Sequence, residues 1–152
     1  MSVTTLKGNL FEAPVGSIIV HACNTKGVWG SGIAKEFAKR FPYARLIYSQ
    51  ACQQHGANLL GTCLLIPTGE QGGYVIGCLF TSKNYGGHVD APPKILKATK
   101  LAVDDLLRQA KIMKPTRPIY MCKINSGLFK VPWNDTKDIL KETGEDFTVY
   151  DY

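Results

Sequence analysis

The chain alternates short runs of apolar, β-branched residues with longer segments in which apolar residues recur every three or four positions. The apolar runs predict strands at 3–7, 17–22, 63–66, 74–81, 119–123 and 147–150. The periodic segments predict helices at 31–40, 42–55, 92–110 and 133–142. This alternation predicts an α/β fold, namely a three-layer α/β/α sandwich around a central mixed, mostly parallel sheet.

Residue types within these segments refine the prediction. The continuous apolar run Ser17–Ala22 is typical of a strand covered on both faces, whereas Val3–Lys7 is a candidate edge strand. Residues 68–73 are expected to form a turn between two strands. Pro42 is expected to begin a helix. We expect that helix to face the core with Leu46, Ile47, Gln50 and Ala51.

Length and composition indicate one ordinary globular domain spanning residues 1–152. Apolar residues make up 45% of the chain and charged residues 20%, which excludes a disordered protein. No apolar run approaches the roughly 20 residues of a membrane helix, and the N-terminus shows no signal peptide. We therefore expect no membrane association, a cytoplasmic and/or nuclear location, and a monomer.

The five cysteines are scattered, and the spacing shows no CxxC motif and no Cys/His cluster. We interpret them as reduced thiols and not as a disulfide framework or a zinc site. The HExxH and DxD motifs are also missing, so no metal and no other cofactor is expected.

The net charge of +6 comes mainly from residues 83–130. A basic surface attracts anions, and these include nucleic acids, free nucleotides and phosphorylated metabolites. Because no run of four or more Lys or Arg occurs, a small anionic ligand is favoured over nucleic acid.

Two glycine-marked loops follow predicted strands. The first is Gly30-Ser31-Gly32-Ile33, and the second is Asn125-Ser126-Gly127-Leu128-Phe129. A strand that turns on small residues into a helix directs backbone N–H groups at one point, which suits phosphate. Two such loops predict a ligand with more than one phosphate, bound in the crevice beyond the carboxyl ends of the strands.

Four side chains near these loops have alternative interpretations. Asn24 could bind sugar hydroxyls or satisfy its own turn. His21 could act as a general acid or base, or it could be a buried core residue. Trp29 could cover the site or pack in the core. Tyr150 could stack on a base or close the sheet.

These segments together resemble a macro domain, the ADP-ribose-binding module. The resemblance is carried by Lys7–Leu10, Ile19–Asn24, Trp29–Ala34, Ile124–Phe129 and Phe147–Tyr150. Within that family the chain is most similar to the fungal-type ADP-ribose 1''-phosphate phosphatases. This closer likeness is carried by His21 before Asn24, by residues 78–82, and by Val131-Pro132-Trp133.

The resemblance implies the ligand, the reaction and the residues of the site. The expected reaction removes the phosphate of ADP-ribose 1''-phosphate, with His21 and Asn24 as catalytic residues. The expected ADP-ribose contacts are Asn9, Leu10, Asn24, Trp29, Gly30, Ser31, Gly32, Ile33, Asn125, Ser126, Gly127, Leu128, Phe129 and Tyr150. Asn9 stands where most macro domains carry the Asp that binds the adenine amino group.

Two alternatives within the same family remain open at this point. One is a hydrolase that removes ADP-ribose from modified proteins or nucleic acids, and the other is a non-catalytic ADP-ribose reader. The terminal ADP-ribose protein glycohydrolases, a sister branch, use a Lys–Asp dyad. The matching positions here are Ser82 and Phe129, so that mechanism is disfavoured unless the neighbouring Lys83 substitutes.

Overall fold

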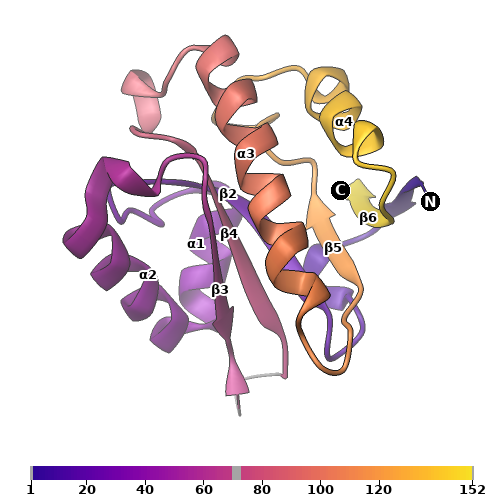
Figure 1. The fold of residues 1–152 in the computed structure, drawn as a ribbon. Coiled ribbons are helices and arrows are strands. Elements are labelled where there is room, and N and C mark those ends of the chain that lie inside the picture. The colour runs from indigo at the N-terminus through magenta and orange to yellow at the C-terminus, as the bar shows by residue number, and fades with distance from the viewer. Residues whose placement is uncertain (1, 70–72, 152) are drawn as a thin grey trace.

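The computed structural model describes residues 2–69 and 73–151, and a six-stranded sheet lies at its centre (Figure 1). The strands occupy nearly the segments that the apolar runs predict. They are β1 (Val3–Lys7), β2 (Ile18–Asn24), β3 (Cys63–Pro67), β4 (Val75–Ser82), β5 (Ile119–Cys122) and β6 (Phe147–Asp151).

The strand order across the sheet is β1-β6-β5-β2-β4-β3. All neighbouring strands run parallel except β3, which is antiparallel to β4. The expected mixed, mostly parallel sheet is therefore confirmed. β1 lies at an edge, and the β2 residues Ile18, Ile19 and Val20 are completely buried, as a strand covered on both faces requires.

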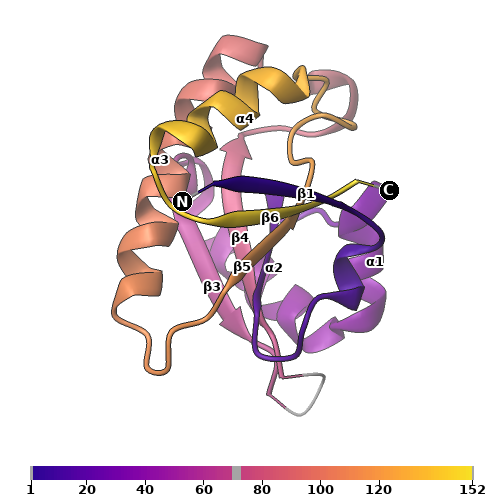
Figure 2. The same ribbon diagram turned by 90° about the vertical axis from the view of Figure 1, so that its right-hand side faces the viewer.

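Four α-helices cover the two faces of the sheet (Figures 1 and 2). They are α1 (Gly32–Arg40), α2 (Pro42–His55), α3 (Pro92–Lys111) and α4 (Trp133–Glu142). Helices α1 and α2 pack with alternate residues of β2 and β4 in one apolar core, whereas α3 and α4 share a second core with the opposite face. Single 3₁₀ turns occur at Leu10–Glu12, Gly56–Leu59 and Gly86–His88.

The prediction of the inward face of α2 is wrong for Leu46 and Gln50, which are exposed, whereas Ile47 is half-buried against the core as expected. The buried residues of α2 are Ala44, Tyr48 and Cys52, while the side chain of Leu46 is 52% exposed. A spacing of four residues places those three side chains on one stripe. The expected turn at 68–73 lies partly outside the described residues.

The connections of β2 and β5 determine where a crevice opens in the sheet. These two strands are neighbours and parallel, but β2 leads to α1 on one face and β5 leads to α4 on the other. Their pairing ends at Val20 and Met121, before the carboxyl end of either strand. Ligands of open α/β sheets bind at such a switch point. No helix among the described residues is long and apolar enough to cross a membrane.

Candidate functional site

A cavity of about 450 Å³ lies at the carboxyl ends of β2 and β5. Its walls are the last residues of β2, the loop and first turn of α1, and the loop that follows β5. The volume falls in the range of pockets that enclose a small organic ligand. The crevice expected from the sequence is therefore present, and both glycine-marked loops line it.

The first loop leaves the N-terminus of α1 open toward the cavity. Ser31 is the N-cap residue, yet its hydroxyl makes no capping hydrogen bond. The N–H groups of Gly32, Ile33 and Ala34 have no acceptor within the described part of the chain. The first N–H groups of a helix carry partial positive charge. This end of α1 can therefore bind an anion.

The second loop, 125–131, is closed by its own backbone. The N–H of Val131 donates to the carbonyl of Asn125 at 2.9 Å, and that of Lys130 donates to Gly127 at 3.0 Å. The N–H groups of Gly127, Leu128 and Phe129 have no acceptor in the described residues. They form a second set of donors at the same cavity.

Asn125 fixes this loop with a side chain that points away from the ligand space. Its backbone adopts φ 67°, a left-handed conformation that Asn tolerates better than most residues. Its Oδ1 accepts a hydrogen bond from Thr81 at 2.9 Å, and its Nδ2 donates to Thr99 at 2.9 Å and to Thr136 at 3.4 Å. These three threonines belong to β4, α3 and α4, so one buried amide ties the loop to three elements.

The two loops come into contact across the cavity. A Cβ placed on Gly32 would lie 3.4 Å from Cδ1 of Leu128, and Gly32 has φ 59°, which favours glycine. Leu128 is 57% exposed, so its side chain bridges the loops at the surface. Both sets of free N–H groups therefore border one cavity, as binding of a diphosphate requires.

Asn24, expected to bind ribose, also organises the first loop. Its Oδ1 accepts hydrogen bonds from the N–H groups of Lys26 and Val28, and its Nδ2 donates to the Val28 carbonyl at 2.8 Å. The side chain lines the cavity and is 5% exposed. Among the described residues Nδ2 has a single acceptor, so its second hydrogen remains available to a ligand.

Tyr48 of α2 holds Asn24 in place through its hydroxyl group. Its hydroxyl lies 2.7 Å from the Asn24 carbonyl oxygen and 3.1 Å from Oδ1. Burial raises the pKa of Tyr48 well above its usual value, so the hydroxyl stays protonated and remains a donor. Its ring also stacks on Trp29 with centroids 4.6 Å apart.

Tyr48→Phe is expected to destabilise the protein by about 1–2 kcal/mol, because it removes a buried donor and leaves the ring in place. Affinity for a diphosphate ligand should fall several-fold, since the turn at 24–28 loses its support. Chemical denaturation and calorimetry on the same samples measure both effects. An unchanged midpoint of unfolding would show that this hydrogen bond does not hold the turn.

Asn9 and Phe11 border the cavity on the side of the 3₁₀ turn at Leu10–Glu12. Asn9 caps that turn, since its Oδ1 accepts a hydrogen bond from the Phe11 N–H at 3.0 Å. Phe11 contacts Phe37 edge to face and lies 4.5 Å beneath the Arg40 guanidinium. This aromatic wall was missed in the sequence, because a single Phe beside Leu10 carries no distinctive pattern.

Charged side chains contribute little to the anion site. Lys123 and Glu36 line the cavity. The Lys123 ammonium is paired with Asp151 at 3.2 Å, and Glu36 lies 3.7 Å from Arg40. Recognition of a phosphate here therefore depends on backbone N–H groups and on the α1 terminus.

His21, expected to be catalytic, is not part of the cavity lining. It is completely buried on the face of the sheet covered by α1 and α2. Its ring stacks on Phe37 with centroids 4.0 Å apart and meets Trp29 edge to face at 5.0 Å. A ring enclosed in this way cannot reach a ligand in the cavity, so the structure corrects the expectation that His21 transfers a proton to substrate. Of the two sequence interpretations, the buried core residue is the one observed.

Leu10 and Tyr150, expected to contact ADP-ribose, also lie outside the cavity lining. Leu10 is 1% exposed and packs in the core beneath α1 and α2. Tyr150 stacks on Tyr120 within the sheet, with centroids 5.8 Å apart. Trp29 lines the cavity but is only 4% exposed, so it forms part of the floor and does not cover the site.

The remaining expected contacts all line the cavity. They are Asn9, Asn24, Gly30, Ser31, Gly32, Ile33, Asn125, Ser126, Gly127, Leu128 and Phe129. Ser126 uses its hydroxyl to donate to the Lys123 carbonyl at 2.6 Å. The hydroxyl of Ser82, at one position of the dyad of the sister branch, donates to the Asn84 carbonyl at 2.8 Å and lies outside the cavity lining.

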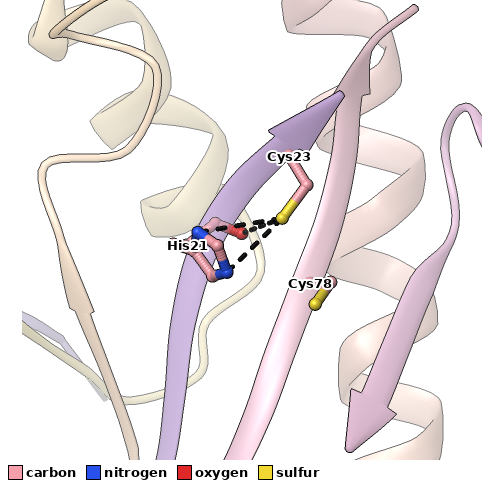
Figure 3. Close-up of side chains that lie close together, drawn as sticks. All are labelled: His21, Cys23 and Cys78. Carbon is pink, nitrogen blue, oxygen red and sulfur yellow. Dashed lines mark hydrogen bonds between the residues drawn. The ribbon is translucent and has the colours of Figure 1, made fainter. Parts of the chain in front are cut away.

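A group of two cysteines and one histidine lies on the neighbouring strands β2 and β4 (Figure 3). The sequence spacing shows no such cluster, but β-sheet register pairs His21 with Cys78, and Cys23 follows on the same face. Burial raises the pKa of the Cys23 thiol, but Cys78 and His21 favour the thiolate more strongly and lower the pKa to about 5. Burial instead raises the pKa of Cys78 well above its usual value.

The comparisons with known proteins agree with this architecture. The model of the macro domain family matches residues 20–140, and the chain therefore belongs to the macro domain family. An ADP-ribose 1''-phosphate phosphatase of Saccharomyces cerevisiae is 38% identical, with 98% of each chain covered. One of Candida albicans is 41% identical, covering 95% of this chain and 96% of the relative. The macrodomain of Mycobacterium tuberculosis DarG has the same fold, with a TM-score of 0.83, 23% identity, and coverage of 99% and 97%.

Proposed function

We propose that this chain binds ADP-ribose derivatives and hydrolyses the phosphate monoester of ADP-ribose 1''-phosphate. The observation that carries the proposal is the pair of N–H donor sets at 32–34 and 127–129, which border one cavity. The names and nearly complete alignment of the yeast relatives support the same reaction.

In this proposal the diphosphate of the ligand lies between the two loops. It accepts hydrogen bonds from both donor sets and benefits from the positive end of α1. The adenine lies toward Asn9 and Phe11, where an aromatic wall borders the cavity. The distal ribose lies toward Asn24, whose second Nδ2 hydrogen can donate to a hydroxyl.

Hydrolysis needs water to attack the phosphorus of the 1''-phosphate while the bond from phosphorus to the ribose oxygen breaks. Inorganic phosphate and ADP-ribose are the products. Phosphoryl transfer of this kind depends mostly on positioning and on stabilising charge on the phosphate oxygens. Backbone N–H groups supply such stabilisation in a partly enclosed site. His21 has no part in this step, because it is enclosed by Phe37 and Trp29.

The decisive assay compares two products. The protein is incubated with ADP-ribose 1''-phosphate and, separately, with an ADP-ribosylated protein. Release of inorganic phosphate from the first, without release of ADP-ribose from the second, is the expected result. Release of ADP-ribose alone would identify a de-ADP-ribosylating hydrolase, and tight binding without either product would identify a reader.

Asn24→Ala is expected to lower phosphatase turnover at least 100-fold, because the ligand loses the amide and the turn at 24–28 loses its bonds to Lys26 and Val28. Tyr48→Phe is the matched control, since it weakens the same turn and retains the Asn24 side chain. Steady-state kinetics of both variants separates the two effects. Full turnover in Asn24→Ala would contradict the assignment of Asn24 to the substrate site.

A further inference from the structure

The group His21, Cys23 and Cys78 is drawn in Figure 3. Residues i and i+2 of a strand share one face, which places His21 and Cys23 side by side on β2. Cys78 of β4 is the cross-strand partner of His21. One nitrogen and two sulfur atoms therefore all lie within 4.8 Å of one another, in a completely buried group.

The separation of Cys23 and His21 matches that of two donors on a tetrahedral metal ion. The Cys23 sulfur lies 3.5 Å from Nε2 and 3.7 Å from Nδ1 of His21. Bonds of about 2.0 Å to nitrogen and 2.3 Å to sulfur at a tetrahedral angle separate the two donors by roughly 3.5 Å. His21 and Cys23 are thus spaced as two donors on one ion, and the Cys78 sulfur lies within 4.8 Å of both.

The chemical types of the three ligand atoms indicate which class of metal ion the group would bind. Two sulfurs and one imidazole suit zinc and other thiophilic ions and do not suit calcium or magnesium, which prefer oxygen ligands. No carboxylate belongs to the group. Three protein donors leave one position of a tetrahedral ion for water or another small ligand.

The neighbouring aromatic rings hold His21 in place, and one buried hydrogen-bond donor beside the group has no partner among the described residues. The His21 ring is fixed by the stacked ring of Phe37 and by the edge of Trp29. The Trp29 indole nitrogen is buried and has no hydrogen-bond partner among the described residues. An N–H group beside a metal-bound thiolate can donate to the sulfur, which is a common support of such sites. Cys23 also lines the cavity, which provides a route for an ion.

We propose that His21, Cys23 and Cys78 bind a thiophilic divalent cation of the zinc class between β2 and β4. The ion would connect the two strands directly beneath the turn at 24–28. It would therefore support the floor of the ADP-ribose cavity. This site is independent of the phosphatase assignment, because none of its evidence involves the phosphate-binding loops.

The test uses the full chain, reduced with a phosphine and freed of metal by a chelator. Titration with Co²⁺ is expected to produce thiolate-to-cobalt charge-transfer absorption and the intense visible bands of a tetrahedral ion, saturating at one ion per chain. Zn²⁺ should abolish these bands and raise the thermal midpoint. A wild-type protein that shows no charge-transfer absorption with excess Co²⁺ overturns the proposal, whatever the variants do.

Two matched variants locate the site. Cys78→Ser is expected to weaken Co²⁺ binding at least 100-fold, since it removes a direct ligand and even supporting residues typically change affinity about 10–100-fold. Cys63→Ser is the control, because Cys63 is also buried but belongs to the core on the opposite face. Circular dichroism checks folding. Equal loss of binding in both variants would place the ion elsewhere and contradict the assignment.

Discussion

Ser31→Asp is expected to lower ADP-ribose affinity about 100-fold while leaving thermal stability unchanged or slightly higher. Ser31 is the exposed N-cap of α1 and makes no capping bond, and Asp is among the best N-cap residues. The same carboxylate would lie beside the N–H groups that bind the diphosphate. Repulsion between unit charges about 5 Å apart costs about 3 kcal/mol at an effective dielectric constant of 20.

Ser31→Asn is the matched control for this experiment. Asn caps helices about as well as Asp and has nearly the same shape, but it carries no charge. Calorimetry should show affinity within a few-fold of wild type for Ser31→Asn and the large loss only for Ser31→Asp. Equal affinities of the two variants would mean that the α1 terminus does not face a ligand anion.

Asn125→Ala is expected to lower the free energy of unfolding by about 3–5 kcal/mol, which is a severe effect for one substitution. The substitution removes the buried amide that bonds Thr81, Thr99 and Thr136, and it leaves polar groups buried without those partners. It also places alanine at φ 67°, a conformation that costs about 1–2 kcal/mol for residues other than glycine and Asn. Urea denaturation measures the loss.

Asn125→Gly separates the two causes. Glycine adopts the left-handed conformation without strain but also lacks the amide. It should therefore be more stable than Asn125→Ala by about 1 kcal/mol and still less stable than wild type. If both variants unfold at the wild-type midpoint, the buried network does not hold the second loop.

Elements that depend on local sequence were predicted closely. Helix α4 (Trp133–Glu142) and helix α2 (Pro42–His55) have the expected bounds, because a proline or a capping glycine marks their ends. The alternation of strands and helices also predicts the sheet type. The inward face of α2 was not predictable in the same way, since packing against β2 and β4 selects Tyr48 over Leu46.

The positions of the phosphate-binding loops were also accessible from sequence, whereas the directions of side chains were not. Glycine and small residues after a strand indicate where N–H groups become free. Nothing local distinguishes Asn125, whose amide bonds buried threonines of other elements, from Asn24, whose amide bonds its own turn. His21 and Cys78 are 57 positions apart along the sequence, and only strand register brings them together.

The central claim is that two separate loops bind one diphosphate through their backbone N–H groups. Titration of ¹⁵N-labelled protein with ADP-ribose, followed by amide NMR, tests it most directly. The account predicts that the amide signals of residues 32–34 and 127–129 shift together, with one dissociation constant, while those of β1 shift little. Shifts confined to one loop, or absent from both, would contradict it.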